Sequence, residues 1–407
     1  MKVSPQDSRH NFRAFIWHAF FLALTTSFMD VDTILPAMLV KAGGGSFALG
    51  LLTAIMIGGA SLMQLVFAGF LYNKAYKKKF LLSGIYLRTF ALASIAVLFY
   101  VSERIPDPIV LVLLFLFISV FSFSGAFANI SYVDILGKSI LSKRRKKFFT
   151  LQQSLNSIGL LASAIVVREL LKYFGYPANY SILFLIAALL LTTASGGFWM
   201  IREVPSGKTG GKRFVDFIKM IPGEIKRNPN LKYYLLLINI MGLAMTLLPF
   251  LILLARERFG LSDASVGNFL LFRVSGMLLI SILIFGLSGK RGYKGILYSG
   301  ILIGIVLPPL ALILSADLFY YQFVFILSGI YFTIYKISIS GILVEISTDE
   351  NRALYTGIAG AGNIFPVVFP LLAGSIISAT GFTAVFIFVS VSLLVSLPMI
   401  SRLNCRN

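Results

Sequence analysis

The stretch Asn73-Lys74-Ala75-Tyr76-Lys77-Lys78 recurs 217 residues later as Lys290-Arg291-Gly292-Tyr293-Lys294-Gly295. The same shift superposes three glycines on three others: Gly50 on Gly267, Gly59 on Gly276 and Gly69 on Gly286. Each copy lies between two long apolar segments. A shared register over this length indicates duplication, and repeats in membrane transporters often form a site between two similar halves. We therefore expect a membrane protein built from two such halves.

The composition excludes an ordinary soluble domain. Of the 407 residues, 57% are hydrophobic and 13% are charged, against about 25% charged in soluble proteins. The mean hydropathy is +0.88. A spanning helix needs about 20 apolar residues, so the length allows roughly twelve spans. With one cysteine, Cys405, and two histidines, we expect no internal disulfide, no metal site and no cofactor.

The apolar segments predict twelve membrane-spanning helices and therefore an all-α fold. They cover residues 14–40, 47–72, 80–101, 109–134, 150–171, 180–201, 232–255, 264–288, 295–315, 319–345, 354–379 and 382–401. The longest connection, 202–231, is polar at first and then has apolar residues at helical spacing, which predicts a linker followed by an amphipathic surface helix. We expect six spans in residues 1–201 and six in 232–407.

The net charge of +20 is distributed asymmetrically. If the N-terminus is cytoplasmic, 27 of the 36 basic residues fall in inner segments, 5 in outer segments and 4 within spans. The positive-inside rule accounts for this split, so we expect cytoplasmic termini in an inner membrane and no nucleic-acid partner. We also expect a monomer in the lipid bilayer. No P-loop sequence is present, and no histidine lies near a spanning serine or cysteine in a catalytic pattern, so we expect no enzyme.

The twelve spans, the basic central loop and the repeated loop after spans 2 and 8 resemble the major facilitator superfamily. The loop pattern of that family is roughly G-x-x-x-D-R-x-G-R/K-R/K, and here the stretch from Gly69 to Lys78 retains the first glycine and the basic positions. Asn73 replaces the acid, and Tyr76 replaces the second glycine. The second copy, from Gly286 to Lys294, is similarly degenerate. The resemblance implies two six-helix halves and secondary transport.

The resemblance also implies a latch at the cytoplasmic side, in which this loop contacts an acid at the inner end of span 4. Asp134 occupies that place, and Glu345 occupies the matching place at the end of span 10. A carboxylate opposite Lys77 or Lys78 is reasonable at a partly desolvated interface. The alternative is that these basic residues only satisfy the topology. The candidate latch residues are Gly69, Asn73, Lys74, Lys77, Lys78, Asp134, Arg291, Lys294 and Glu345.

Charged groups inside spans cost about 2.5–3.5 kcal/mol each and point to function. Asp30 and Asp32 lie in span 1, and Arg273 lies in span 8. On a continuous helix rising about 1.5 Å per residue, Asp30 and Arg273 are at similar depth, roughly 4–5 Å outward of centre, and Asp32 is slightly farther out. We expect a carboxylate–Arg273 pair, with Asp30 better placed. The resemblance implies that spans 1, 2, 7 and 8 close the outer side, so the pair is an outer gate, a proton-sensitive link or a static structural pair.

Lys336 in span 10 is a candidate ligand for an anionic substrate group, because the resemblance implies that spans 1, 4, 7 and 10 line the central cavity. Its alternatives are a pair with an aspartate or extension of the ammonium group to the inner surface. Asn129 and Asn239 are neutral polar candidates for substrate contact, although such residues more often hydrogen-bond between helices.

Together these patterns predict a secondary transporter that moves a small organic solute by alternating access. Proton coupling is a hypothesis resting on Asp30 and Asp32, because carboxylates in a low-dielectric site can exchange protons near neutral pH. The alternatives are an uncoupled facilitator and a non-transporting scaffold or lipid-handling protein.

Overall fold

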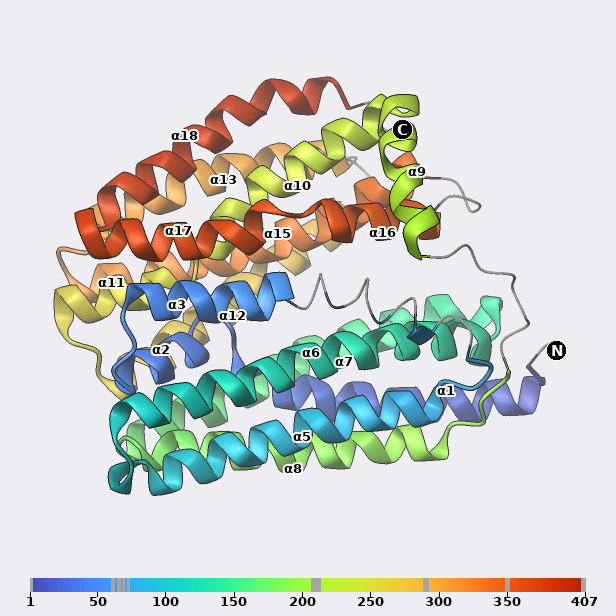
Figure 1. Ribbon diagram of the computed structural model, residues 1–407, viewed down its shortest axis with the longest axis horizontal. Helices are drawn as coiled ribbons and strands as arrows, with labels where there is room; N and C mark the ends of the chain where they lie inside the picture. Colours follow the sequence, from blue (N-terminus) through green and yellow to red (C-terminus); the bar gives the residue numbers. More distant parts are fainter. Residues whose placement is uncertain are drawn as a thin grey trace. The chain divides into compact units, whose positions relative to one another are not determined.

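The computed structural model describes residues 3–59, 63, 67, 70–71, 74–205, 214–287, 293–347 and 352–403. Every regular element within these ranges is a helix (Figure 1). Eleven helical stretches in the described chain are long and apolar enough to cross a membrane. A shorter apolar helix, Ser46–Gly59, begins the predicted second span, whose remaining residues lie largely outside the described ranges. The all-α membrane fold expected from the sequence is confirmed.

The chain divides into two compact units, the first of which comprises residues 1–30 and 59–213. Its helices are α1 (Pro5–Thr26), η1 (Ser27–Met29), α5 (Lys78–Val101), η3 (Ser102–Arg104), α6 (Asp107–Ser139), α7 (Ser142–Tyr173) and α8 (Ala178–Met200). Within the unit, α1 packs on α7 and α8, and α5 packs between α6 and α8 (Figure 1). The Phe15 ring at the centre contacts Tyr132, Phe148 and Phe198, so aromatic packing ties four helices together.

Helices α1 and α7 run parallel in a fixed register. The rings of Phe12 and Phe148 lie 5.7 Å apart, and the Ser163 hydroxyl donates to the Ser27 hydroxyl at 2.8 Å; both pairs are 136 residues apart. Residues that are 136 positions apart therefore lie at the same height along the two helices, over about four turns.

The second unit comprises residues 31–58 and 214–407. Its helices are α2 (Ile34–Lys41), α3 (Ser46–Thr53), the π-helical η2 (Ala54–Gly59, whose last residue falls in the first unit), α9 (Phe214–Arg227), α10 (Pro229–Leu247), α11 (Phe250–Phe259), α12 (Asp263–Leu287), α13 (Tyr293–Leu314), α14 (Leu318–Tyr321), α15 (Phe323–Ile346), α16 (Arg352–Gly362), α17 (Phe365–Thr380) and α18 (Phe382–Ser401). α3 packs along α17, and α2 contacts α11 and α12 (Figure 1). Residues 31–58 thus pack with helices that follow them by more than 200 positions. The division of the repeat into halves at 1–201 and 232–407 stays a prediction.

Spans 1 and 7 are each broken at the same place in the repeat. In span 1, α1 ends at Thr26, the extended backbone of Asp30 follows η1, and α2 starts at Ile34. In span 7, α10 ends at Leu247 and α11 starts at Phe250. The shift of 217 that superposes the repeated loops places Asp32 on Pro249, so the two interruptions coincide. Interrupted spanning helices in transporters frequently border the substrate site.

Two glycines let α12 and α15 approach closely. A Cβ on Gly276 of α12 would collide with the carbonyl oxygen of Ile326, and a Cβ on Gly329 of α15 would collide with the carbonyl oxygen of Arg273. Small residues permit such close contact between spanning helices. The backbone of Arg273 is therefore held directly against α15.

Candidate functional site

A buried ion pair joins Asp32 to Arg273 within the second unit. Asp32 lies in the turn between η1 and α2. Arg273 lies in the third turn of α12, ten residues after the helix begins at Asp263. The Arg273 guanidinium donates to the Asp32 carboxylate, and the two side chains are 3% and 5% exposed for Arg273 and Asp32, respectively. Because desolvating two charges is costly, such a pair persists only with close opposite charge.

The structure pairs Arg273 with Asp32, the aspartate that the depth comparison ranked second, and the preference for Asp30 stays a prediction. The depth comparison assumed a continuous helix through span 1. The observed break after Met29, with Asp30 in an extended conformation (φ −59°, ψ 126°), changes both the height and the direction of the residues that follow. Asp30 is itself buried.

An aromatic ring links this ion pair to Lys336. The Arg273 guanidinium carbon lies 4.8 Å from the centroid of the Phe332 ring, and the Lys336 ammonium lies 5.0 Å from the same centroid. Phe332 and Lys336 are four residues apart on α15, hence on one face. Cations near an aromatic face are attracted by its quadrupole. The four side chains form one cluster, which we call the α12–α15 cluster: Asp32, Arg273, Phe332 and Lys336.

The α12–α15 cluster carries a formal charge of +1. Lys336 is attracted by the Asp32 charge and repelled by the Arg273 charge, and the Asp32 charge is already taken up by Arg273. Lys336 is exposed whereas its two charged neighbours are buried. Lys336 forms no ion pair with another residue in the described part of the chain. The arrangement therefore offers an accessible ammonium group beside a neutralised pair, which can attract an anion.

A second ion pair connects α2 to the start of α12. The Lys41 ammonium lies 3.3 Å from the Asp263 carboxylate, and both side chains are largely shielded from solvent. Asp263 precedes Arg273 by ten residues on one helix, a rise of about 15 Å. Two ion pairs at different heights thus join the α2 region to α12. The sequence analysis missed this contact, because the two residues are 222 positions apart.

The two asparagines predicted in spans occupy different environments. Asn239 of α10 is buried and bridges the break between α16 and α17: its amide donates to the Gly362 carbonyl at 2.7 Å, and its oxygen accepts from the Phe365 amide at 2.9 Å. Asn239 therefore replaces helical hydrogen bonds that the break in span 11 removes. Asn129 on α6 is exposed.

At the start of α5, the structure brings one of the two predicted latch lysines to Asp134. The buried Lys77 places its ammonium 3.1 Å from the Asp134 carboxylate, which also pairs with Lys138. The Lys78 ammonium instead donates to the carbonyls of Trp199 and Ile201, at 2.6 and 2.9 Å, at the end of α8. Cations at a helix C-terminus satisfy its last carbonyl groups.

Glu203 is a contact of this loop that the sequence analysis missed. Its carboxylate accepts from the backbone amides of Lys77 and Lys78, the latter at 3.0 Å, where α5 begins. A carboxylate at this position satisfies orphan amide groups and complements the helix dipole. The available signal was an acid directly after span 6, but nothing in the sequence connects it with a residue 125 positions earlier.

Three of the remaining latch candidates lie among the described residues, and three do not. The Lys74 ammonium lies 5.2 Å from the Phe70 ring centroid, and the Lys294 ammonium reaches the Ser401 carbonyl at 3.4 Å. One carboxylate oxygen of Glu345 is buried without a hydrogen-bond partner among the described residues. Gly69, Asn73 and Arg291 lie outside the described residues. Within the described chain, no group of three or more metal-binding side chains is found.

The family model of the Major Facilitator Superfamily matches residues 16–335. The chain therefore belongs to this superfamily and is a multi-pass membrane transporter by family rather than an enzyme. The resemblance inferred from the repeated loop and the twelve spans is confirmed.

Solved structures show the same fold at low sequence identity. A variant of the nucleoside transporter NupG matches with a TM-score of 0.68 and 15% identity, over 97% of this chain and 99% of that chain. A POT family transporter in complex with a thioalcohol-conjugated peptide gives 0.68 and 13%, over 96% and 95%. A bacterial homologue of the iron transporter ferroportin gives 0.67 and 13%, over 98% and 99%. No curated protein matches the sequence.

Proposed function

We propose that this protein is a proton-coupled secondary transporter that moves a small organic solute with an anionic group by alternating access. The observation that carries the proposal is the α12–α15 cluster, in which an accessible Lys336 stands beside the buried Asp32–Arg273 pair. Ionisable groups are retained in spanning helices at a cost, chiefly where they bind substrate or relay protons.

In the proposed mechanism, the anionic group of the solute binds the Lys336 ammonium group and competes with Asp32 for Arg273. An anion near Arg273 weakens its pair with Asp32, and the released carboxylate takes up a proton. Separation of Asp32 from Arg273 also removes one of the two ion pairs that connect the α2 region to α12, so the start of α2 is held less firmly. Substrate binding, protonation and movement of α2 are thereby coupled through one guanidinium group.

The proposal includes the topology. The 27-to-5 distribution of basic residues supports cytoplasmic termini in an inner membrane, and the protein acts as a monomer. A reporter fused at each terminus tests the orientation: activity of a periplasm-only reporter at the C-terminus would contradict it.

Reconstitution tests transport itself. Purified protein is screened by thermal shift against matched carboxylates, phosphate esters, amides and amines, and the ligands that stabilise it are tested for flux in proteoliposomes with an imposed pH gradient. We expect saturable accumulation of an anionic ligand driven by the gradient. Lys336→Gln should abolish binding of that ligand and Lys336→Arg should retain part of it. Stabilisation by amines alone would refute the anionic substrate.

Three outcomes separate the proposal from its alternatives. Asp32→Asn should end gradient-driven accumulation but leave exchange of labelled for unlabelled solute, because exchange needs no net proton movement. Flux that is indifferent to the pH gradient would identify an uncoupled facilitator. Ligand binding without any flux would identify a non-transporting protein.

A further inference from the structure

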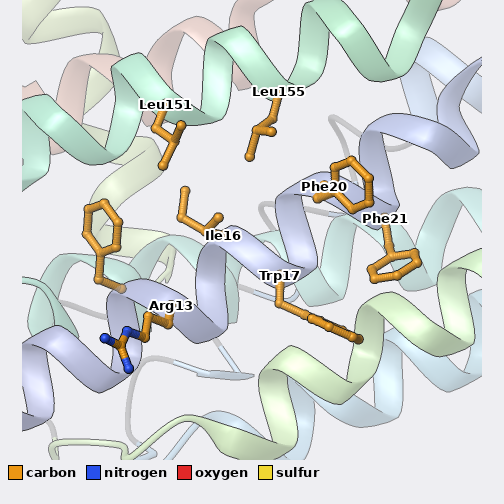
Figure 2. Close-up of a pocket in the computed structure, with 8 residues that line it drawn as sticks. Arg13, Ile16, Trp17, Phe20, Phe21, Leu151 and Leu155 are labelled. Atoms are coloured by element: carbon orange, nitrogen blue, oxygen red, sulfur yellow. The ribbon is translucent and has the colours of Figure 1, made fainter. Parts of the chain in front are cut away.

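An open apolar groove of about 520 Å³ runs between α1 and α7 in the first unit (Figure 2). Aromatic side chains of α1 line one side, and Leu151 and Leu155 of α7 line the other. Trp17 and Phe20 are 46% and 37% exposed, and Leu151 is 37% exposed. Exposed apolar surface on membrane-spanning segments is compatible with hydrocarbon and unfavourable in water.

A cation stands at the same end of each helix that borders the groove. On α1, Arg13 is followed by Trp17 and Phe21, each four residues farther along; on α7, Lys147 is followed by Leu151 and Leu155 at the same spacing. Residues spaced by four lie on one helix face. Because the helices are parallel with an offset of 136, Arg13 and Lys147 lie within about one turn of the same height.

Both cations are available to a ligand. Arg13 and Lys147 are exposed, and neither forms an ion pair with another of the residues that the structure describes. The neighbouring Arg145, by contrast, is engaged with the carbonyls of Gly137 and Ile140 at the end of α6. Arg13 lines the groove itself, at the end opposite Phe20 and Phe21 (Figure 2).

We propose that this groove binds an anionic phospholipid, with an acyl chain along Trp17, Phe20 and the α7 leucines and the phosphate between Arg13 and Lys147. The order along α1, cation then tryptophan then phenylalanines, follows the order of headgroup, interface and hydrocarbon in a bilayer. The charge of the groove end complements an anionic headgroup and distinguishes it from a zwitterionic one. Arg13 directly precedes the predicted start of span 1, and Lys147 lies three residues before the predicted start of span 5.

Trp17 provides a direct reporter of the bound chain. The protein has two tryptophans, so Trp199→Phe leaves Trp17 as the only one. The Trp17 indole N–H donates to the Thr193 carbonyl at 2.8 Å, which fixes the ring at the groove independently of any lipid. Bromine atoms on an acyl chain quench indole fluorescence only on close approach.

The test compares phosphatidylglycerol and phosphatidylcholine with the same brominated chains, at equal mole fractions in nanodiscs of unlabelled phosphatidylcholine. In the Trp199→Phe background we expect phosphatidylglycerol to bind more tightly, by about fivefold for each cation. Arg13→Gln and Lys147→Gln should each lower this preference, and the double variant should bring the ratio to about one. Arg227→Gln, which removes an exposed cation on α9, is the matched control and should leave the ratio unchanged.

Equal quenching by both lipids in the Trp199→Phe protein would overturn the proposal. A preference that survives in the double variant would also overturn it, because the charge would then act elsewhere. If Arg13→Gln does not fold, Lys147→Gln alone tests the same preference for phosphatidylglycerol. The assay measures no flux, so its failure and the failure of the proposed transport function are separate results.

Discussion

The Arg273 guanidinium and the Asp32 carboxylate form a buried ion pair that ties α12 to the turn between η1 and α2. The pair lies where span 1 loses its helical hydrogen bonds, so a substitution on either side leaves a buried charge without this ion-pair partner. The stability of this region should therefore depend on the two residues jointly.

Removal of Arg273 alone should be severe. Arg273→Gln leaves the Asp32 carboxylate buried without its partner, which costs about 3–5 kcal/mol of unfolding free energy. The double change Asp32→Asn with Arg273→Gln should cost less than the sum of the single changes, because no lone charge remains. Chemical denaturation in detergent micelles measures the cycle.

The matched control is the cycle of Asp263→Asn with Arg273→Gln, whose effects on the unfolding free energy should be additive, since these residues are about 15 Å apart. Additive effects for Asp32 and Arg273 as well would refute the coupling.

Glu203 should stabilise the start of α5. Glu203→Gln weakens the contacts to the Lys77 and Lys78 amides and removes the charge that complements the helix dipole, a loss of about 1 kcal/mol. We expect a lower melting temperature and a smaller difference from wild type at high salt, because salt screens the dipole term. Glu257→Gln on α11, an exposed position, serves as the control. An equal effect of both substitutions would argue against the cap.

Asp134 should restrain the first turns of α5. Asp134→Asn leaves the buried Lys77 ammonium without its carboxylate, and we expect a cost of about 1–3 kcal/mol. Lys138→Gln should cost less than about 0.5 kcal/mol, because it removes only a partly exposed pair on one helix. Hydrogen exchange of the amides at residues 78–82 provides the measurement, with faster exchange in Asp134→Asn. Unchanged exchange there would mean that the lysines serve only the topology.

Asn239 should hold the break in span 11. Asn239→Leu leaves the partly buried Gly362 carbonyl and Phe365 amide without their side-chain partner, which should cost about 1 kcal/mol for each group left unsatisfied. The melting temperature and the exchange of the Phe365 amide report the loss. Asn129→Leu, an exposed change on α6, should leave both nearly unchanged. A similar fall for the two variants would show that the bridge contributes nothing specific.

The sequence by itself determined the class of the fold. Apolar segments of about 20 residues must form helices in a bilayer, because their backbone groups have no water to bond. The loop repeated at a spacing of 217 showed the duplication, and together with the charge distribution it led to the superfamily. It also singled out Arg273, Lys336 and Asp134, because an ionisable residue in or beside an apolar segment stands out without any knowledge of contacts.

Only the tertiary structure decided which of these residues meet. Sequence reasoning treated span 1 as a straight helix and preferred Asp30; the break after Met29 redirected the chain and brought Asp32 to Arg273. Glu203 contacts the Lys78 amide and Lys41 pairs with Asp263, at sequence separations of 125 and 222 residues. No local sequence pattern specifies a contact over such separations. The position of a break within an apolar segment depends on tertiary hydrogen bonds such as those of Asn239. Hydropathy records only that a segment enters the membrane, whereas packing against neighbouring helices decides where it bends.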